Sequence, residues 1–498
     1  MRKQLLAASC LLLSLAAMSC GSETPQTPSQ SGSQNQQSDP SAESASVVYD
    51  IPEPELPALD LTGQNYAFFS KGDPATAVST ADGNFSERDF LVADSLIGEV
   101  VNDAVFNRNL MVEQKFGCKV KSIVLDSDPN LLVMGGDTSF DVIYTDAVII
   151  GDTIASGAYL NICDFPYISP TAEYWSPFCV RDTVFRGRLY MMPCDICLIP
   201  LANTGCLYFN KRILSEYDLE NPYDMVHSNT WTIDAFLNMI KQVSKDLNGD
   251  GIMDTEDLYG ALVMAQFRMA CFTQFYVGSG KTLTAEDPDL GRVISVDGEF
   301  AQTLIDMLTP VLEDKTVSLN WYDVERLAGS YEAYRAMFQE GHALFLQDSI
   351  GAMDTLRDME DDFGIVPNPK YDTTQEAYYH RVQPHVSMLA IPATVTDYEK
   401  VGAVTEYMAW LSHYTVLPAY YEVTIKGKRT RDEDAVEMLD IIHDTIVFDF
   451  GDVYDTWIPN YFYDSYTAGS YARKMGSNLK TLNRRLTNYT KALDALDD

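Results

Sequence analysis

The sequence is poor in positive charge. It carries 35 Lys and Arg residues against 72 Asp and Glu residues, which gives a formal net charge of −37. A surface this acidic repels nucleic acid and offers no polybasic patch for an anionic membrane. It also disfavours phosphorylated ligands, whereas neutral ligands are compatible with it.

Cysteine and histidine are scarce as well. Nine cysteines and six histidines are spread over 498 residues, so a dense disulfide framework is excluded. The stretch Cys194-Asp195-Ile196-Cys197 has the spacing of a redox or metal motif, but neither a second pair nor a histidine is near it in sequence. We therefore interpret Cys194 and Cys197 as small buried residues beside a strand.

Long apolar runs are missing beyond the N-terminus. Arg2 and Lys3 precede an apolar run over 5–17, and Ala17-Met18-Ser19-Cys20 follows it. The run is too short for a spanning helix, and a small-residue site that ends in cysteine is typical of a lipoprotein signal. We predict a signal peptide over 1–19 and a lipidated Cys20 that anchors the protein to the cell membrane, facing away from the cytoplasm. The alternative is an ordinary signal peptide with an incidental cysteine.

A low-complexity segment follows the anchor. Residues 21–46 are rich in Ser, Gln, Pro, Thr and Gly, and they cannot bury enough apolar surface to fold. We predict that 20–46 comprises the lipidated cysteine and a flexible tether. The folded part then begins at Val47, and its length favours two domains.

Strand-like and helix-like stretches alternate through the folded part. Strands are predicted at 66–69, 119–125, 141–144, 207–210, 343–346 and 386–391, and helices at 103–116, from 211, at 232–246 and at 398–412. This alternation indicates an α/β protein with mainly parallel sheets. Sheets of this kind bind ligands beyond the carboxyl ends of their strands.

Enzyme signatures are absent from the sequence. It has no GxSxG, HExxH, Walker or GxGxxG motif, and acidic runs such as Glu360-Asp361-Asp362 are typical of solvated faces. We expect a protein without catalytic residues. A surface glycan hydrolase that uses some of the many carboxylates remains an alternative.

One acidic loop has the pattern of a calcium site. Oxygen ligands at positions one, three, five and nine, with glycine at six, match an EF-hand loop, and a backbone carbonyl adds another ligand. Position twelve holds an Asp where a longer Glu is usual. We predict a structural Ca²⁺ ion; the alternative is a solvated turn between helices. The predicted ligands are Asp246, Asn248, Asp250, Ile252, Asp254 and Asp257.

Aromatic residues are abundant, with 5 Trp, 29 Tyr and 22 Phe. Sugars present apolar faces that stack on aromatic rings, and hydroxyl groups that need polar partners. Trp231 and Trp410 lie at or within helical stretches and are expected in the core. Trp457 follows a loop-like stretch and is the best stacking candidate among the tryptophans.

Several blocks of the sequence resemble the family 1 extracellular solute-binding proteins of carbohydrate ABC importers, which are maltose-binding-protein-like. The most specific blocks are Leu207–Lys211, Leu219–Tyr223 and Thr230–Asp234. Weaker blocks lie at 101–116, 140–144, 362–370, 418–422 and 431–440. Together they span most of the chain after the tether.

The resemblance implies a two-lobed, periplasmic-binding-protein-like α/β fold with a hinge and an interlobe ligand cleft. One lobe would comprise 47–200 plus 388–425, and the other 201–387 plus 426–498. The protein would act as a monomer that captures a mono- or oligosaccharide and delivers it to an ABC transporter permease. A lipoprotein that binds peptides or other small solutes is the alternative.

The resemblance also implies ligand-binding residues. Asp146 follows a cleft-facing strand of the first lobe, and Asn203 lies in the crossover segment where a relative carries a sugar-binding carboxylate. Gln347 and Asp348 stand in the loop where relatives carry a stacking aromatic. Trp457 falls where the second lobe supplies another aromatic wall.

Overall fold

The computed structural model describes residues 52–71, 87–264, 270–330, 332–356, 358–383, 385–425, 433–453 and 457–496. The chain divides into two units, Met1–Pro52 and Glu53–Asp498, and the fold described below is that of the second unit. The predicted signal peptide, the anchor Cys20 and the predicted tether lie outside the described residues. Among the described helices, none combines the length and the apolar character needed to cross a membrane.

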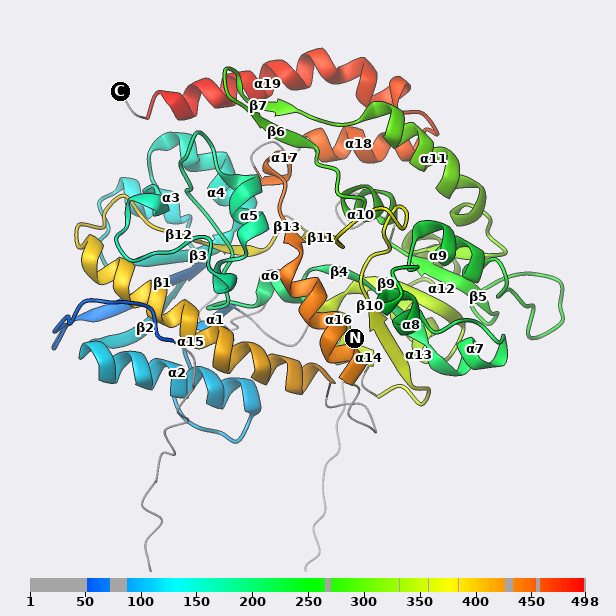
Figure 1. The fold of residues 1–498 in the computed structure, drawn as a ribbon, viewed down its shortest axis with the longest axis horizontal. Coiled ribbons are helices and arrows are strands. Elements are labelled where there is room, and N and C mark those ends of the chain that lie inside the picture. The colour runs from blue at the N-terminus through cyan, green and yellow to red at the C-terminus, as the bar shows by residue number, and fades with distance from the viewer. Residues whose placement is uncertain are drawn as a thin grey trace, which may run out of the picture. The chain divides into compact units, whose positions relative to one another are not determined.

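The first sheet holds four strands in the order β12-β3-β1-β2 (Figure 1). They are β1 (Asn65–Lys71), β2 (Lys119–Leu125), β3 (Val142–Asp146) and β12 (Ser387–Ala390). β1 runs parallel to β2 and β3, whereas β12 is antiparallel to β3. Tyr66, Phe68 and Phe69 of β1 are all buried, as expected for a central strand covered on both faces.

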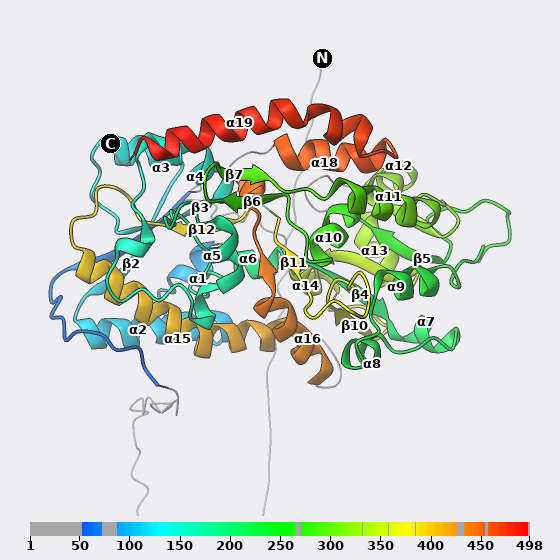
Figure 2. The same ribbon diagram turned by 45° about the horizontal axis from the view of Figure 1, so that its top comes forward.

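Two long helices lie side by side next to this sheet. They are α2 (Val100–Phe116) and α15 (Tyr398–Ile425), and they run together in both views (Figure 1 and Figure 2). Gly117 ends α2 with a φ of 78°, a left-handed conformation that glycine adopts without strain. The sheet and these helices are called the first lobe.

The second sheet holds five strands in the order β10-β4-β9-β5-β8. They are β4 (Gly205–Asn210), β5 (Tyr259–Val263), β8 (Ser318–Asn320), β9 (Ala343–Ser349) and β10 (Phe363–Val366). β5 runs parallel to β8 and β9, whereas β4 is antiparallel to β9 and β10. This sheet and its helices are called the second lobe.

The helices of the second lobe bury a cluster of aromatic rings against the sheet. Phe236 of α9 packs against Phe345 of β9 at 5.3 Å between ring centroids, and Trp231 packs against the same ring at 5.7 Å. The second-lobe helices are α7 (Lys211–Glu216), α8 (Pro222–His227), α9 (Ile233–Ile240), α10 (Cys271–Gly278), α11 (Gly298–Leu312), α12 (Trp321–Ala328), α13 (Ala333–Gln339) and α14 (Met353–Leu356).

Several segments connect the two lobes. The chain passes from the first sheet to the second through 193–204, which contains α6 (Ile199–Ala202), and it returns between β10 and β12. Near the return, β11 (His380–Arg381) pairs in parallel with β13 (Ile446–Val447), which follows α16 (Glu433–Asp444).

The C-terminal helices contact both lobes. In Figure 2, α18 (Trp457–Thr467) and α19 (Ser477–Asp494) run along the same edge of the fold as the hairpin of β6 (Thr284–Asp287) and β7 (Gly291–Ile294). Arg188 donates a hydrogen bond of 3.2 Å to the Leu493 carbonyl at the end of α19. The remaining helices are α1 (Glu87–Leu91), α3 (Pro129–Met134), α4 (Ala147–Thr153), α5 (Pro177–Thr183) and α17 (Phe450–Val453).

The predicted α/β fold is confirmed, with two differences in detail. The four-stranded sheet is parallel except for β12, as predicted, whereas the five-stranded sheet is mixed, because β4 runs antiparallel to both β9 and β10. The helix predicted over 232–246 ends at Ile240, since Lys245 instead forms a bridge with Leu258. The predicted lobe boundaries stay a prediction.

Candidate functional site

A cavity of about 500 Å³ lies at the carboxyl ends of two parallel strands of the second lobe. Val263 and Met264 line it where β5 ends, and Asn320 lines it where β8 ends. This is the edge of an open α/β sheet at which ligands bind. Other lining residues come from the surrounding helices: Phe272, Thr309, Glu313, Tyr322, Tyr463 and Tyr466.

A second cavity, of about 370 Å³, adjoins the first and shares Tyr322 and Tyr463 with it. Trp457 and Tyr461 complete its aromatic lining. We call the six aromatic side chains of the two cavities the aromatic groove: Phe272, Tyr322, Trp457, Tyr461, Tyr463 and Tyr466.

The rings of the aromatic groove differ in exposure. Phe272 is buried and stacks on Tyr466, with their ring centroids 5.2 Å apart, so it forms the base of the wall. Tyr322 is 50 % exposed and Trp457 is 48 % exposed. Arg485 of α19 lies 5.0 Å from the centroid of the Trp457 ring and contributes a cation–π contact. Exposed aromatic faces beside a buried ring make a surface that can stack against a flat apolar ligand face.

Polar groups lie beside these rings. The Tyr466 hydroxyl donates a hydrogen bond of 3.0 Å to Glu313, and Lys315 places its Nζ 3.2 Å from Glu313 and 2.7 Å from Asp323. Burial raises the pKa of Tyr463 to about 12, so its hydroxyl stays protonated and can donate a hydrogen bond at neutral pH. The groove therefore combines aromatic faces with hydrogen-bonding groups whose negative charge is partly neutralised by a lysine.

The structure does not bring the predicted ligand-binding residues together. Trp457 lines the smaller cavity, although it begins helix α18 rather than standing in a loop. Asp146 lies at the carboxyl end of β3 in the first lobe, where it caps α4 by accepting from the Val148 amide at 2.8 Å. Its other oxygen lies 2.7 Å from Nδ1 of His385, and its side chain is 30 % exposed.

The other three predicted residues make internal contacts. Asn203 is buried and donates to the Ile199 carbonyl at 3.1 Å. Gln347 and Asp348 are buried within β9 and do not lie in a loop after it. Gln347 accepts a hydrogen bond of 2.9 Å from the amide of Met264, which lines the larger cavity, whereas Gln347 itself does not line it. Neither Asn203 nor Asp348 lines either cavity.

Asp348 has a structural partner. Both of its carboxylate oxygens accept from the guanidinium of Arg335 on α13, at 2.8 and 2.9 Å. The Asp348 side chain is completely buried, so the charge is compensated inside the protein rather than offered to a ligand.

The tyrosines of the aromatic groove are absent from the predicted set. Their signal in the sequence is helical spacing: Trp457 and Tyr461 are four residues apart, and Tyr463 and Tyr466 are three apart. Such spacing places the two members of each pair on one side of α18, but it does not tell whether that side faces the core or a ligand. The expectation that Trp231 and Trp410 belong to the core is confirmed, because both are buried.

The acidic loop after α9 is held by its own backbone. The two oxygens of Asp246 accept from the amides of Gly249 and Gly251, at 2.6 and 2.8 Å. Asp257 is buried and accepts from the amides of Leu247 and Asp254, at 2.8 and 2.9 Å. The first and twelfth positions of the predicted calcium loop therefore face its interior.

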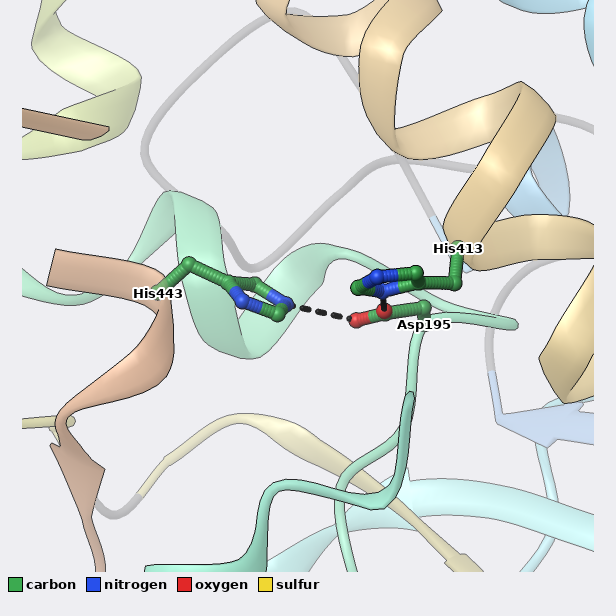
Figure 3. Close-up of side chains that lie close together, drawn as sticks. All are labelled: Asp195, His413 and His443. Atoms are coloured by element: carbon green, nitrogen blue, oxygen red, sulfur yellow. Dashed lines mark hydrogen bonds and ion pairs between the residues drawn. The ribbon is translucent and has the colours of Figure 1, made fainter. Parts of the chain in front are cut away.

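The paired cysteines have neighbours that are distant in sequence. Cys194 and Cys197 are both buried, as interpreted from the sequence. Asp195 between them contacts His413 at 2.6 Å and His443 at 3.0 Å (Figure 3). The sequence offered no sign of this, since the two histidines lie more than two hundred residues further along the chain.

The charges of this cluster are coupled. Burial disfavours the charged forms of both Asp195 and His443, but the contact between them outweighs that effect. It keeps the pKa of Asp195 below its usual value and raises the pKa of His443 to about 10. Without a bound cation, the cluster therefore holds a buried carboxylate against an imidazolium.

No protein-family model matches the sequence, and a search of the curated proteins finds no match. Solved structures of similar fold are found, and the three described here have low sequence identity to this chain. The GacH receptor of Streptomyces glaucescens is 13 % identical with a TM-score of 0.52, covering 86 % of this chain and 99 % of its own. A sugar transporter protein of Rhizobium etli, in an open conformation, is 14 % identical with a TM-score of 0.54, with the same two coverages.

A third similar structure is a family 1 extracellular solute-binding protein of Bifidobacterium longum subsp. infantis. It is 15 % identical with a TM-score of 0.50, and the match covers 87 % of this chain and 99 % of that protein. At this identity the likeness shows the fold alone. The chain has the two-lobed fold of periplasmic binding proteins, which confirms the resemblance at that level.

Proposed function

We propose that this protein is an extracytoplasmic solute-binding protein that captures a carbohydrate and delivers it to an ABC transporter permease. The aromatic groove at the carboxyl ends of β5 and β8 carries this proposal, because it pairs ring faces with hydroxyl and carboxylate groups that can hydrogen-bond a sugar. The fold supports it, since the GacH receptor of similar fold was solved in complex with acarbose.

The groove supplies one wall of a binding site. The residues that line the two cavities come from the second lobe and from the C-terminal segment that begins with α18. In a two-lobed protein the opposite wall comes from the other lobe when a hinge closes. Asp146 and His385, at the carboxyl end of β3 and just before β12, are the polar groups of the first lobe that we propose for this wall.

The cellular setting is part of the proposal. A lipidated Cys20 would hold the folded unit on the membrane surface beside its permease. The protein would act as a monomer. We also propose a structural Ca²⁺ ion in the loop from Asp246 to Asp257, supported by the inward-facing carboxylates of those two residues.

A ligand screen tests the function. The purified protein is heated with neutral mono- and oligosaccharides and, separately, with short peptides. A ligand present at about a hundred times its Kd stabilises the folded state by about 2.7 kcal/mol, which produces a measurable rise in Tm. A shift with one class of sugar supports the proposal, whereas a shift with peptides alone replaces it by the peptide-binding alternative.

Two variants locate the site. Tyr322→Ala and Trp457→Ala each remove a half-exposed ring from the groove, so each is expected to weaken sugar binding by about tenfold while Tm stays near that of the parent. Leu131→Ala is the control, because Leu131 is 74 % exposed on α3 of the first lobe and lines neither cavity. Recovery of the sugar unchanged after long incubation separates a binding protein from a glycan hydrolase.

A further inference from the structure

Three side chains that are distant in sequence meet at the junction of the two lobes. Asp195 belongs to the segment 193–204 that leaves the first lobe, His413 lies on α15, and His443 lies on α16 (Figure 3). Their potential ligand atoms all lie within 4.8 Å of one another. Among the described residues, this is the group of His, Cys, Asp or Glu side chains in which three ligand atoms lie close enough together to hold a metal ion.

Both imidazole rings have a second carboxylate partner on the side away from Asp195. Nδ1 of His443 lies 3.1 Å from an oxygen of Asp444, and Nε2 of His413 lies 3.6 Å from an oxygen of Glu173. Histidines that bind metals almost always direct their other ring nitrogen to such an acceptor, which fixes the tautomer and the ring orientation. The cluster therefore has both an inner set of ligands and an outer set of acceptors.

We propose that Asp195, His413 and His443 bind one transition-metal ion of the Zn²⁺ class. The ligand atoms are Nδ1 of His413, Nε2 of His443 and a carboxylate oxygen of Asp195. Two imidazoles and one carboxylate are ligands that Zn²⁺ accepts, and water completes a tetrahedral set. The His413 side chain is 16 % exposed, which gives the ion and this water a route from solvent. The site is separate from the aromatic groove and does not depend on the proposed function.

Only a small movement is needed to admit the ion. Zn²⁺ holds nitrogen and oxygen ligands at about 2.0–2.2 Å, which places tetrahedral ligand atoms roughly 3.3 Å apart. The present contacts of 2.6 and 3.0 Å are hydrogen bonds, so each imidazole nitrogen must move away from Asp195 by less than about 1 Å, and the two nitrogens, within 4.8 Å of each other, must come to the same spacing. The proton that each ring now directs at Asp195 leaves to solvent, and the metal takes its place.

At this location a bound ion would link segments of both lobes. It would tie the crossing segment at Asp195 to α15 of the first lobe and to α16, which packs against β10 of the second lobe. Binding energy gained only in the folded state adds directly to stability. The metal-bound protein is therefore expected to melt at a higher temperature than the metal-free protein.

The experiment measures zinc directly. The full-length protein is freed of metal with a chelator, dialysed against Zn²⁺ and analysed for bound metal, and Co²⁺ is added separately as an optical probe. We expect one tightly bound equivalent of Zn²⁺, a rise in Tm on its addition, and the visible absorption of a tetrahedral Co²⁺ centre.

Three variants assign the site. His413→Ala is expected to lose the tightly bound Zn²⁺. Asp444→Asn is expected to weaken the affinity for Zn²⁺ by about tenfold or more, because it changes the outer acceptor of His443. His227→Ala is the control, because His227 is an exposed histidine on α8 outside the cluster. If metal-free parent protein takes up no tight Zn²⁺, or if His413→Ala binds as much as the parent, the proposal is wrong and the cluster is only a buried ion pair. Should His413→Ala fail to fold, Asp444→Asn and the Co²⁺ spectrum of the parent decide the question.

Discussion

Arg381 and Asp452 form an ion pair from which solvent is excluded almost completely. The guanidinium Nε and Nη2 of Arg381 lie 2.8 and 2.6 Å from the two carboxylate oxygens of Asp452, and the side chains are 0 % and 1 % exposed. The pair joins β11, on the return from the second lobe, to α17 at the start of the C-terminal helices. Its two-pronged geometry holds these distant segments in one orientation.

Breaking this pair is expected to cost stability. Asp452→Asn removes the carboxylate charge that faces the buried guanidinium of Arg381, and we expect it to lower the free energy of unfolding by about 3–5 kcal/mol in urea titrations. Glu216→Gln is the control, because its pair with Arg212 is exposed and spaced i,i+4, so its loss should cost less than about 1 kcal/mol. Equal effects of the two substitutions would contradict the assignment of a buried pair.

Asp449, near the same ion pair, predicts a pH dependence of stability. Burial and the neighbouring charge of Asp452 raise the pKa of Asp449 to about 6, although hydrogen bonds from Thr284 and Gly451 oppose the shift. Its pKa in the unfolded chain is about 3.9. Between pH 4 and 6, Asp449 is therefore ionised in the unfolded chain but still protonated in the folded protein, so a rise in pH favours unfolding. Stability contributed by Asp449 is therefore present below pH 4 and is lost as pH rises through 6, by roughly 3 kcal/mol.

The measurement compares urea unfolding of the parent and of Asp449→Asn at pH 4.5 and pH 7. The asparagine of the variant cannot ionise. The free energy of unfolding of the variant should therefore lack the part of the decline with rising pH that Asp449 contributes. Asp306→Asn, a substitution on the exposed face of α11, should keep the decline of the parent. If the decline with pH is the same in Asp449→Asn as in the parent, Asp449 is already ionised in the folded protein at pH 4.5.

Much of the fold follows from local pattern. The strand predicted at 119–125 matches β2 residue for residue, because an apolar and β-branched run between polar stretches specifies a strand locally. The relative direction of the strands does not follow from local pattern. The alternation of strands and helices predicts mainly parallel pairs, but β4 and β9 pair antiparallel. Helix α9 also depends on contacts that are distant in sequence. Val243 continues the apolar helical spacing, but the helix ends at Ile240, and Lys245 forms a β-bridge with Leu258.

The candidate site was harder to predict than the fold. Asp348 follows an apolar run and so resembles a cleft residue, but its partner Arg335 lies on a neighbouring helix and neutralises it. The meeting of His413 and His443 at Asp195 depends on the packing of α15 and α16, which no sequence spacing records. Among the predicted ligand contacts, Trp457 is the one that lines either of the two cavities of the aromatic groove.

Asp348 and Tyr322 are therefore expected to respond in opposite ways to substitution. Asp348→Ala removes the buried carboxylate that pairs with Arg335 and should lower the free energy of unfolding by about 3 kcal/mol, with the affinity of the folded fraction for sugar unchanged. Tyr322→Ala should do the reverse, since a ring that is 50 % exposed contributes little to folding. Calorimetric sugar binding and urea unfolding of both variants provide the check. A loss of affinity in Asp348→Ala at full folding would restore the sequence-based assignment of that residue.

Calcium binding by the loop from Asp246 to Asp257 is the last prediction. Hard oxygen ligands at alternating positions surround one point, and Asp246 and Asp257 already face the interior of the loop. We expect calorimetry to show one bound Ca²⁺ and a chelator to lower Tm. Asp250→Asn, which removes a charge at the fifth position, should weaken the binding. His413→Ala should leave it intact, because that histidine belongs to the separate cluster at Asp195. Absence of heat on adding Ca²⁺, together with a Tm that the chelator does not change, would identify the loop as a turn stabilised by its own backbone hydrogen bonds.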